Sequence, residues 1–182
     1  MAILKVAQLG HPILRQVAVP IPPERIGSPE VQELISDMSH TLHEYDGAGL
    51  AAPQVHVSVR LVVLILLDEE RVLINPIITP LTDELIRTVE GCLSVTNMRA
   101  AVDRPAKIRL QALDETGAEV DLELEDFDAV VVQHECDHLD GIIYVDRCDT
   151  TTLAFLGEYR RWGSLDTLAE RMARVVVSQR ST

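Results

Sequence analysis

Two histidines four residues apart, with a glutamate directly after the first, give this sequence its strongest chemical signal. Residues 134–138 read H-E-C-D-H, which matches the pattern H-E-x-x-H. On a helix, side chains at positions i and i+4 project from one face, so both imidazoles can bind a single metal ion. Glu135 would then lie beside the open coordination position, where it can accept a proton from water activated by the metal. A chance match is the alternative, because only three positions are specified.

A catalytic metal site needs a third protein ligand, and the sequence offers two candidates. Cys92 lies upstream in the segment E-G-C-L-S, residues 90–94, at the end of a strand-like run. Glu158 lies downstream, at a spacing that would suit a zinc peptidase. Cys92 could also be a core thiol, which is the usual fate of a free cysteine. The residue types alone leave this choice open.

A third segment, G-A-G-L-A-A-P-Q at residues 47–54, combines glycines and alanines with a final glutamine. Small residues allow a substrate to approach the backbone closely. The amide of Gln54 can both donate and accept hydrogen bonds. Taken alone, the segment could equally be a simple connection between a helix and a strand.

Together the three segments resemble the signatures of the peptide deformylase family: G-x-G-L-A-A-x-Q, E-G-C-L-S and Q-H-E-x-D-H-L-x-G. Here they occupy residues 47–54, 90–94 and 133–141, in the family's order and with similar spacing. The resemblance extends loosely over residues 4–147. It implies a metallo-hydrolase that removes the N-formyl group from the N-terminal formylmethionine of nascent polypeptides and releases formate.

The resemblance also implies a metal-ligand set. Cys92, His134 and His138 would hold the ion, Glu135 would be the general acid and base, and Glu158 would be excluded as a ligand. A thiolate ligand is compatible with Fe(II) as well as Zn(II). The resemblance implies Fe(II) as the native ion, with Zn(II) or Ni(II) able to substitute.

For the reacting carbonyl, the resemblance implies that the Gln54 amide and the backbone N–H of Leu93 stabilise the charge that develops on oxygen. It also places Arg99 near the substrate. Glu90 is a candidate for holding a ligand or a substrate amide, with a surface position as the alternative.

A pocket for methionine needs apolar walls. The residues one helical turn before His134 are wall candidates, and those around residue 49 could line the pocket or pair with a peptide by strand addition. Ordinary core packing is the alternative for all of them. These candidates are Val130, Val131, Ala48, Gly49 and Leu50.

Two positions depart from the family pattern. Thr96 stands where proline is common, and His56 stands where glycine or aspartate is frequent. Neither is an expected ligand, so the departures concern loop conformation more than chemistry.

Hydrophobic periodicity predicts the elements that must position these groups. We expect helices at 29–45 and 126–139, the second closed by Gly141, and one or two helices between 150 and about 177. We expect strands at 60–67, 72–75 (stopped by Pro76) and 84–89, and a hairpin of 107–113 with 119–125. The resemblance implies an α+β, deformylase-like fold. In it, small, mostly antiparallel sheets surround the central helix that carries H-E-x-x-H, and we add a C-terminal helix.

Composition limits the remaining possibilities. The chain has 182 residues, which suggests a single catalytic domain spanning 1–182. Sixteen Lys and Arg against 29 Asp and Glu give a net charge of −13, which disfavours DNA binding. The longest strongly apolar run, residues 61–67, is far shorter than the ~20 residues of a membrane span, and no secretory signal is evident. We therefore expect a cytoplasmic protein.

The C-terminal tail has a different charge balance from the rest of the chain. Residues 159–182 contain five arginines and two acidic residues. A basic helix there could contact ribosomal RNA, where nascent formylmethionyl peptides emerge. The alternative is an amphipathic helix packed on the body.

A non-catalytic, deformylase-like binding module is the remaining alternative for the function of the whole chain.

Overall fold

The computed structural model describes residues 2–163. It contains eight strands arranged in two antiparallel sheets. The larger sheet has the order β1-β2-β3-β6-β7 and the smaller one the order β4-β5-β8. The strands are β1 (Gly49–Ala51), β2 (Leu61–Leu66), β3 (Glu69–Pro80), β4 (Leu85–Cys92), β5 (Val95–Pro105), β6 (Lys107–Leu113), β7 (Glu119–Glu125) and β8 (Ala154–Phe155).

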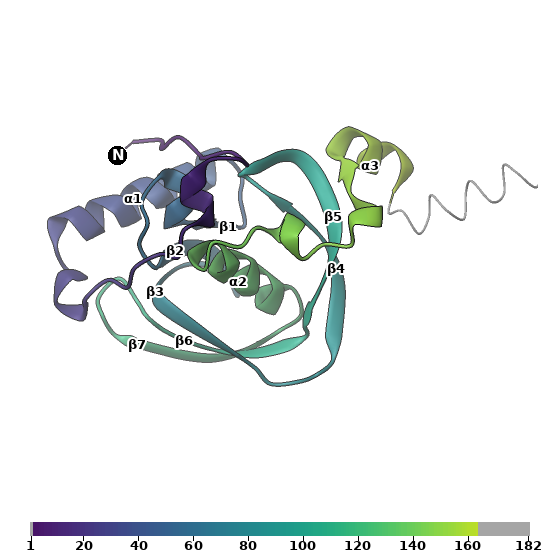
Figure 1. The fold of residues 1–182 in the computed structure, drawn as a ribbon. Coiled ribbons are helices and arrows are strands. Elements are labelled where there is room, and N and C mark those ends of the chain that lie inside the picture. The colour runs from purple at the N-terminus through teal and green to yellow at the C-terminus, as the bar shows by residue number, and fades with distance from the viewer. Residues whose placement is uncertain (1, 164–182) are drawn as a thin grey trace, which may run out of the picture.

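Three α-helices accompany the sheets: α1 (Pro29–Glu44), α2 (Asp126–Leu139) and α3 (Leu156–Trp162). Figure 1 shows α2 at the centre of the molecule, with β6 and β7 on one side and β4 and β5 on another. The expected α+β fold with a central helix is therefore confirmed. Among the described residues, no helix is long and apolar enough to cross a membrane.

At strand β2, the larger sheet is buried on both faces. Val62 and Leu64 pack toward α2, whereas Leu61 and Val63 pack toward α1. A strand that alternates between two apolar layers must be apolar at every position. This explains the continuous hydrophobic run at residues 61–66.

The helix α2 begins and ends as the sequence predicts. It spans Asp126–Leu139, and Gly141 follows with φ at 73°. The N–H of Ile142 donates to the carbonyl oxygen of Asp137 at 2.9 Å, closing the last turn. A left-handed residue after a helix is favourable for glycine, because glycine has no Cβ. The predicted hairpin of β6 and β7 is also confirmed, as are β2, β4 and α1.

Two predicted elements were wrong. The strand expected at 72–75 extends over 69–80 and passes through Pro76. The pairing of β3 with β6 shifts register between Ile74 and Ile77, and Asn75 has a positive φ of 53°. Proline is tolerated at such an irregularity because its missing N–H costs no ladder hydrogen bond.

The second prediction that was wrong concerns the C-terminal part of the chain. The one or two helices expected from residue 150 begin later: residues 150–155 form a short 3₁₀ turn and β8, and the helix α3 starts at Leu156. Gly163, with φ at 79°, follows the end of α3. The predicted helical stretch beyond residue 163 lies outside the described residues.

Candidate metal centre

Cys92 and the two histidines of α2 form a compact group of potential ligands. The ligand atoms of Cys92, His134 and His138 lie within 4.8 Å of one another. The Cys92 Sγ is 3.2 Å from His138 Nε2. One thiol and two imidazoles at such distances can converge on one ion and leave a further position open.

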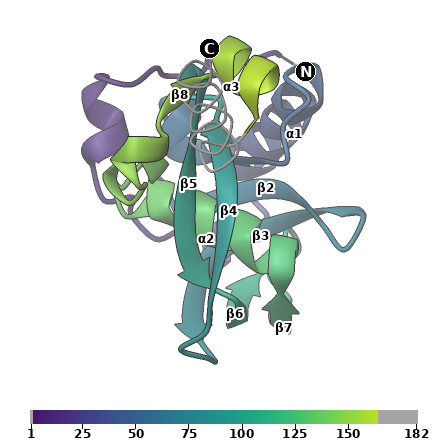
Figure 2. The same cartoon turned by 90° about the vertical axis from the view of Figure 1, so that its right-hand side faces the viewer.

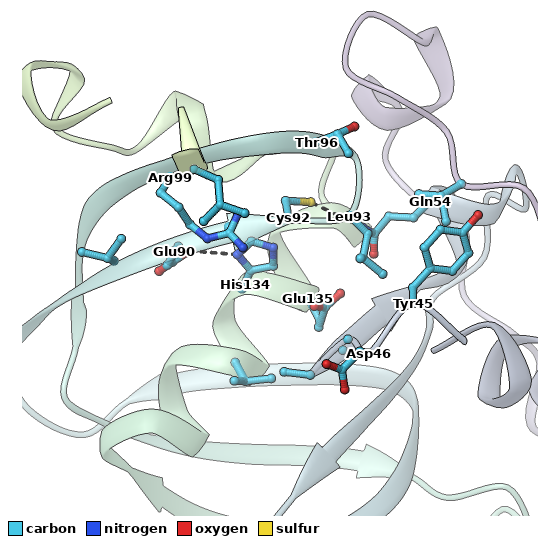
Figure 3. Close-up of a pocket in the computed structure, with 18 of the residues that line it drawn as sticks. Tyr45, Asp46, Gln54, Glu90, Cys92, Leu93, Thr96, Arg99, His134 and Glu135 are labelled. Atoms are coloured by element: carbon cyan, nitrogen blue, oxygen red, sulfur yellow. Dashed lines mark hydrogen bonds and ion pairs between the residues drawn. The ribbon is translucent and has the colours of Figure 1, made fainter. Parts of the chain in front are cut away.

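Glu90 orients one of these imidazoles from the neighbouring strand. His134 Nδ1 lies 2.8 Å from Glu90 Oε2, so Nε2 is the nitrogen left free for an ion (Figure 3). Partners of this kind fix the ring orientation of metal-binding histidines. Glu90 is 6 % exposed, so its alternative assignment as a surface residue was wrong.

Arg104 holds Glu90 in turn. Its guanidinium donates to both carboxylate oxygens of Glu90, at 2.5 and 2.9 Å, and to Asp137 Oδ2 at 2.9 Å. Burial would raise the pKa of Glu90, but the hydrogen bonds from Arg104 and His134 outweigh it and lower the pKa to about 2. Glu90 is therefore a carboxylate at neutral pH.

Glu135 lines a pocket that lies beside the ligand group. It is 4 % exposed, and its Oε2 has no hydrogen-bond partner within residues 2–163. Burial raises its pKa to about 7. A carboxyl group with a pKa near neutrality can both accept and return a proton under physiological conditions.

The close approach of strand β1 to the Glu135 carboxyl group depends on Gly49. A Cβ at this position would lie 2.5 Å from Glu135 Oε1. Only glycine therefore allows β1 to pass this close to the carboxylate.

Gln54 lines the same pocket from the 3₁₀ helix Ala52–Val55, and Leu93 lines it from the turn between β4 and β5. Gln54 Oε1 accepts a hydrogen bond from the backbone N–H of Ala51 at 2.8 Å, which fixes the orientation of the amide. Gln54 Nε2 lies 3.2 Å from Ser94 Oγ and 3.5 Å from Cys92 Sγ. The amide donor is thus held beside the ligand group.

The N-terminal segment braces the loop of Leu93. Gln8 Nε2 donates to the carbonyl oxygen of Leu93 at 3.1 Å, and Thr96 Oγ1 donates to Gln8 Oε1. Thr96 therefore contributes a hydrogen bond where the family commonly has proline. The other departure, His56, adopts a left-handed conformation with φ at 67°, a backbone that glycine enters without strain.

A cavity of about 620 Å³ opens beside the ligand group. Most of the expected substrate-binding residues line it, namely Ala48, Gly49, Glu90, Arg99, Val130 and Val131. Leu50 does not: it is fully buried in the core against α1. Side chains alternate along a strand, so with Gly49 facing Glu135, Leu50 must point the other way.

Sequence reasoning missed several supporting residues. Arg104 follows Ala100 and Val102 at a period of two, which places it on the inward face of β5 and could have revealed its burial. Tyr144 gave no such signal; its ring stacks on His134 at 6.0 Å. Glu158, the rejected ligand candidate, lies on α3 and accepts a hydrogen bond from Trp162 Nε1 at 2.9 Å.

Two imidazoles and a buried carboxyl on one helix, with a thiol from the smaller sheet beside them, are the groups expected at the metal site of a metallohydrolase. Comparisons with known proteins give the family. A model described as polypeptide deformylase matches residues 3–153, and the chain belongs to this family. It is accordingly a metal-dependent hydrolase that removes the N-formyl group from the N-terminal formylmethionine of nascent polypeptides.

Individual relatives agree with this assignment. A peptide deformylase of Leptospira biflexa is 42 % identical over 164 residues, covering 84 % of this chain and 92 % of its own length. The structure of a peptide deformylase from Thermotoga maritima matches with a TM-score of 0.78 and 34 % identity, over 82 % of this chain and 99 % of that one. A Met-Ala-Ser-bound class I type b peptide deformylase from Acinetobacter baumannii matches with a TM-score of 0.77 and 33 % identity, over 80 % and 98 %.

Proposed function

We propose that Cys92, His134 and His138 hold the catalytic metal ion. The observation that carries the proposal is the convergence of their ligand atoms within 4.8 Å. Burial lowers the pKa of His138, which keeps this imidazole neutral and able to bind a metal. His138 Nδ1 has no hydrogen-bond partner in the described part of the chain. The donor set of one sulfur and two nitrogens fits Fe(II), our proposed native ion, as well as Zn(II) or Ni(II).

A divalent ion in this site would supply a Lewis acid that polarises the formyl carbonyl and acidifies water. Glu135 supplies the proton transfers. Its Oε2, which has no hydrogen-bond partner among residues 2–163, accepts a proton from the attacking water and then gives it to the nitrogen of the departing amine. Water is consumed, the C–N bond breaks, and formate and a free N-terminus result.

Gln54 and Leu93 stabilise the charge on the formyl oxygen in this proposal. The Gln54 amide is already oriented by Ala51, so little reorganisation is needed during the reaction. The backbone N–H of Leu93 would be the second donor. Removing one such donor typically slows turnover by ~10²–10³-fold.

The substrate is held by the cavity wall and by the edge of the larger sheet. Val130 and Val131 would contact the methionine side chain, and Ala48 and Gly49 at edge strand β1 would pair with the peptide backbone. Arg99 would lie beside the following residues. The Met-Ala-Ser peptide in the relative from Acinetobacter baumannii supports a peptide of this kind as the ligand.

Two substitutions test the proposed roles separately. Glu135→Gln should keep its metal and lose turnover by at least ~10²-fold, measured as formate release from formyl-Met-Ala-Ser. Cys92→Ala should lose its metal, as measured by elemental analysis after anaerobic purification. It should also lose turnover in the same formate-release assay. Normal turnover in Glu135→Gln would refute the assigned role of this carboxyl group.

We further propose that residues 1–182 form one catalytic domain that acts in the cytoplasm, with the basic C-terminal tail in contact with the ribosome. The charge of residues 159–182 supports the last point. Salt-dependent cosedimentation with ribosomes should weaken when residues 159–182 are deleted. Unchanged association would contradict it.

A further inference from the structure

One of the residues that line the cavity lies beyond the segment that the family model matches, and it forms the wall considered below. That match ends at residue 153, and β8 and α3 follow it. Leu156, the first residue of α3, lines the same cavity as Val130 and His134. Its side chain is partly buried. No role proposed so far involves this residue.

The segment before this wall is fastened to the smaller sheet. The N–H of Asp149 donates to the carbonyl oxygen of Ala101 at 2.9 Å, and the N–H of Ala101 donates to Thr152 Oγ1 at 2.7 Å. Arg87 adds an ion pair to Asp149 at 2.5 Å. The connection to β8 is therefore held on β5 before α3 begins.

Strand pairing then sets the position of the wall. Ala154 of β8 lies opposite Arg99 of β5, and β5 pairs with β4, which ends at Cys92 (Figure 2). Neighbouring strands lie about 4.8 Å apart, so two spacings separate β8 from β4 by about 10 Å. Arg99 spans part of this interval, because its guanidinium covers Gly91, where a Cβ would lie 2.2 Å from Nη1.

We expect an extended peptide in the cavity to bring its third side chain toward this wall. Residues in a strand advance by about 3.3 Å each, and their side chains alternate between two faces. If the formylmethionine side chain enters the cavity beside Val130 and Val131, the third side chain points to the same face about 7 Å further on. This geometry rests on the substrate placement proposed above.

We propose that Leu156 is a specificity-determining residue that contacts the third residue of the formylated peptide and favours an apolar side chain there. Leu156 presents only aliphatic atoms to the cavity, and burying a side chain against them favours leucine over serine. The contact contributes to substrate binding and does not involve the reacting atoms. It should therefore act mainly on KM.

The test compares two tripeptides on the full-length, metal-loaded enzyme. The substrates are formyl-Met-Ala-Leu and formyl-Met-Ala-Ser, and the readout is kcat and KM for formate release. Leu156→Ala should lower kcat/KM for the leucine peptide by about three- to tenfold, through KM, and leave the serine peptide within about twofold.

Phe155 provides a matched control one residue away. It is 66 % exposed and does not belong to the residues that line the cavity. Phe155→Ala should leave both peptides within about twofold of wild type. Leu156→Asn, whose side chain also branches at Cγ but is polar, repeats the test by polarity if the alanine variant folds poorly.

Three results would overturn the proposal. An equal loss on both peptides would indicate a structural role for Leu156. No loss on either would refute the contact. A loss confined to a third substrate, formyl-Met-Leu-Ser, would assign Leu156 to the second residue of the peptide instead. Failure of wild type to release formate from any of the peptides would instead refute the function itself.

Discussion

Replacing Arg104 with methionine tests the buried network that holds the metal-binding helix. Arg104 and Glu90 have side chains that are only 4 % and 5 % exposed. Methionine keeps the aliphatic stem but leaves Glu90 with His134 as its remaining polar partner. Asp137 retains an ion pair with Arg147 at 2.9 Å, so the loss concentrates on Glu90.

The expected cost follows from the pKa of Glu90. This pKa is about 2 in the fold instead of 4.5, which corresponds to roughly 3 kcal/mol in favour of the ionised folded state. Removing one partner of a buried ion pair typically costs ~3–5 kcal/mol. We therefore expect Arg104→Met to lower the free energy of unfolding by about 3 kcal/mol.

The effect should also depend on pH with a definite sign. Because the pKa of Glu90 is lowered by folding, its stabilisation is present above pH 4.5 and is lost as the pH falls toward 2. The difference between Arg104→Met and wild type should therefore shrink over this range. Urea unfolding at several pH values measures it, with and without a chelator.

Arg109 offers a control with the same chemistry at the surface. It bonds both oxygens of Asp121, at 2.8 and 2.6 Å, but the two side chains are 50 % and 45 % exposed. Exposed pairs contribute ~0–1 kcal/mol, so Arg109→Met should lie close to wild type. If Arg104→Met and Arg109→Met destabilise the protein equally, the reasoning about burial is wrong.

Three further outcomes follow from the site. Gly49→Ala should retain metal but lose turnover by at least about tenfold, since the new Cβ would displace the carboxyl group of Glu135; unchanged kcat would count against this. Gln8→Ala should lower kcat by about two- to tenfold without loss of metal, because the Leu93 loop loses its brace, and Thr96→Val should have a similar but smaller effect. A chelator should abolish formate release and lower the Tm, and added Fe(II) or Zn(II) should restore both; activity that persists in metal-free protein would contradict the proposed centre.

The central helix and its ligands could be predicted because their signals are local. His134 and His138 share a face through the helical period alone, and Gly141 marks the end of the helix. Cys92 was different, because sequence spacing alone did not distinguish it from Glu158 as the third metal ligand. Only the family resemblance favoured Cys92. Its convergence with α2 depends on how the two sheets pack, which no local pattern encodes.

Errors arose where tertiary contacts override local preference. Pro76 normally ends a strand, but pairing with β6 continues across it through an irregular register. Leu50 lies in a segment of small residues that face the pocket, yet strand alternation turns it into the core. Arg104 was missed because its partners lie 14 and 33 residues away along the chain.

The N-terminal segment has a consequence for how the site comes together during synthesis. The N–H of Ala7 donates to the carbonyl oxygen of Gln54, and the N–H of Leu9 donates to that of Ser94, both at 2.7 Å. Residues 7 and 9 thus tie together two segments that are translated much later. The proposed oxyanion donors, Gln54 and Leu93, can reach their final places only after Ser94 has left the ribosome, and the proposed ligand group must wait until His138 follows. This enzyme's own chain therefore becomes competent to process other chains only after residue 138 has been made.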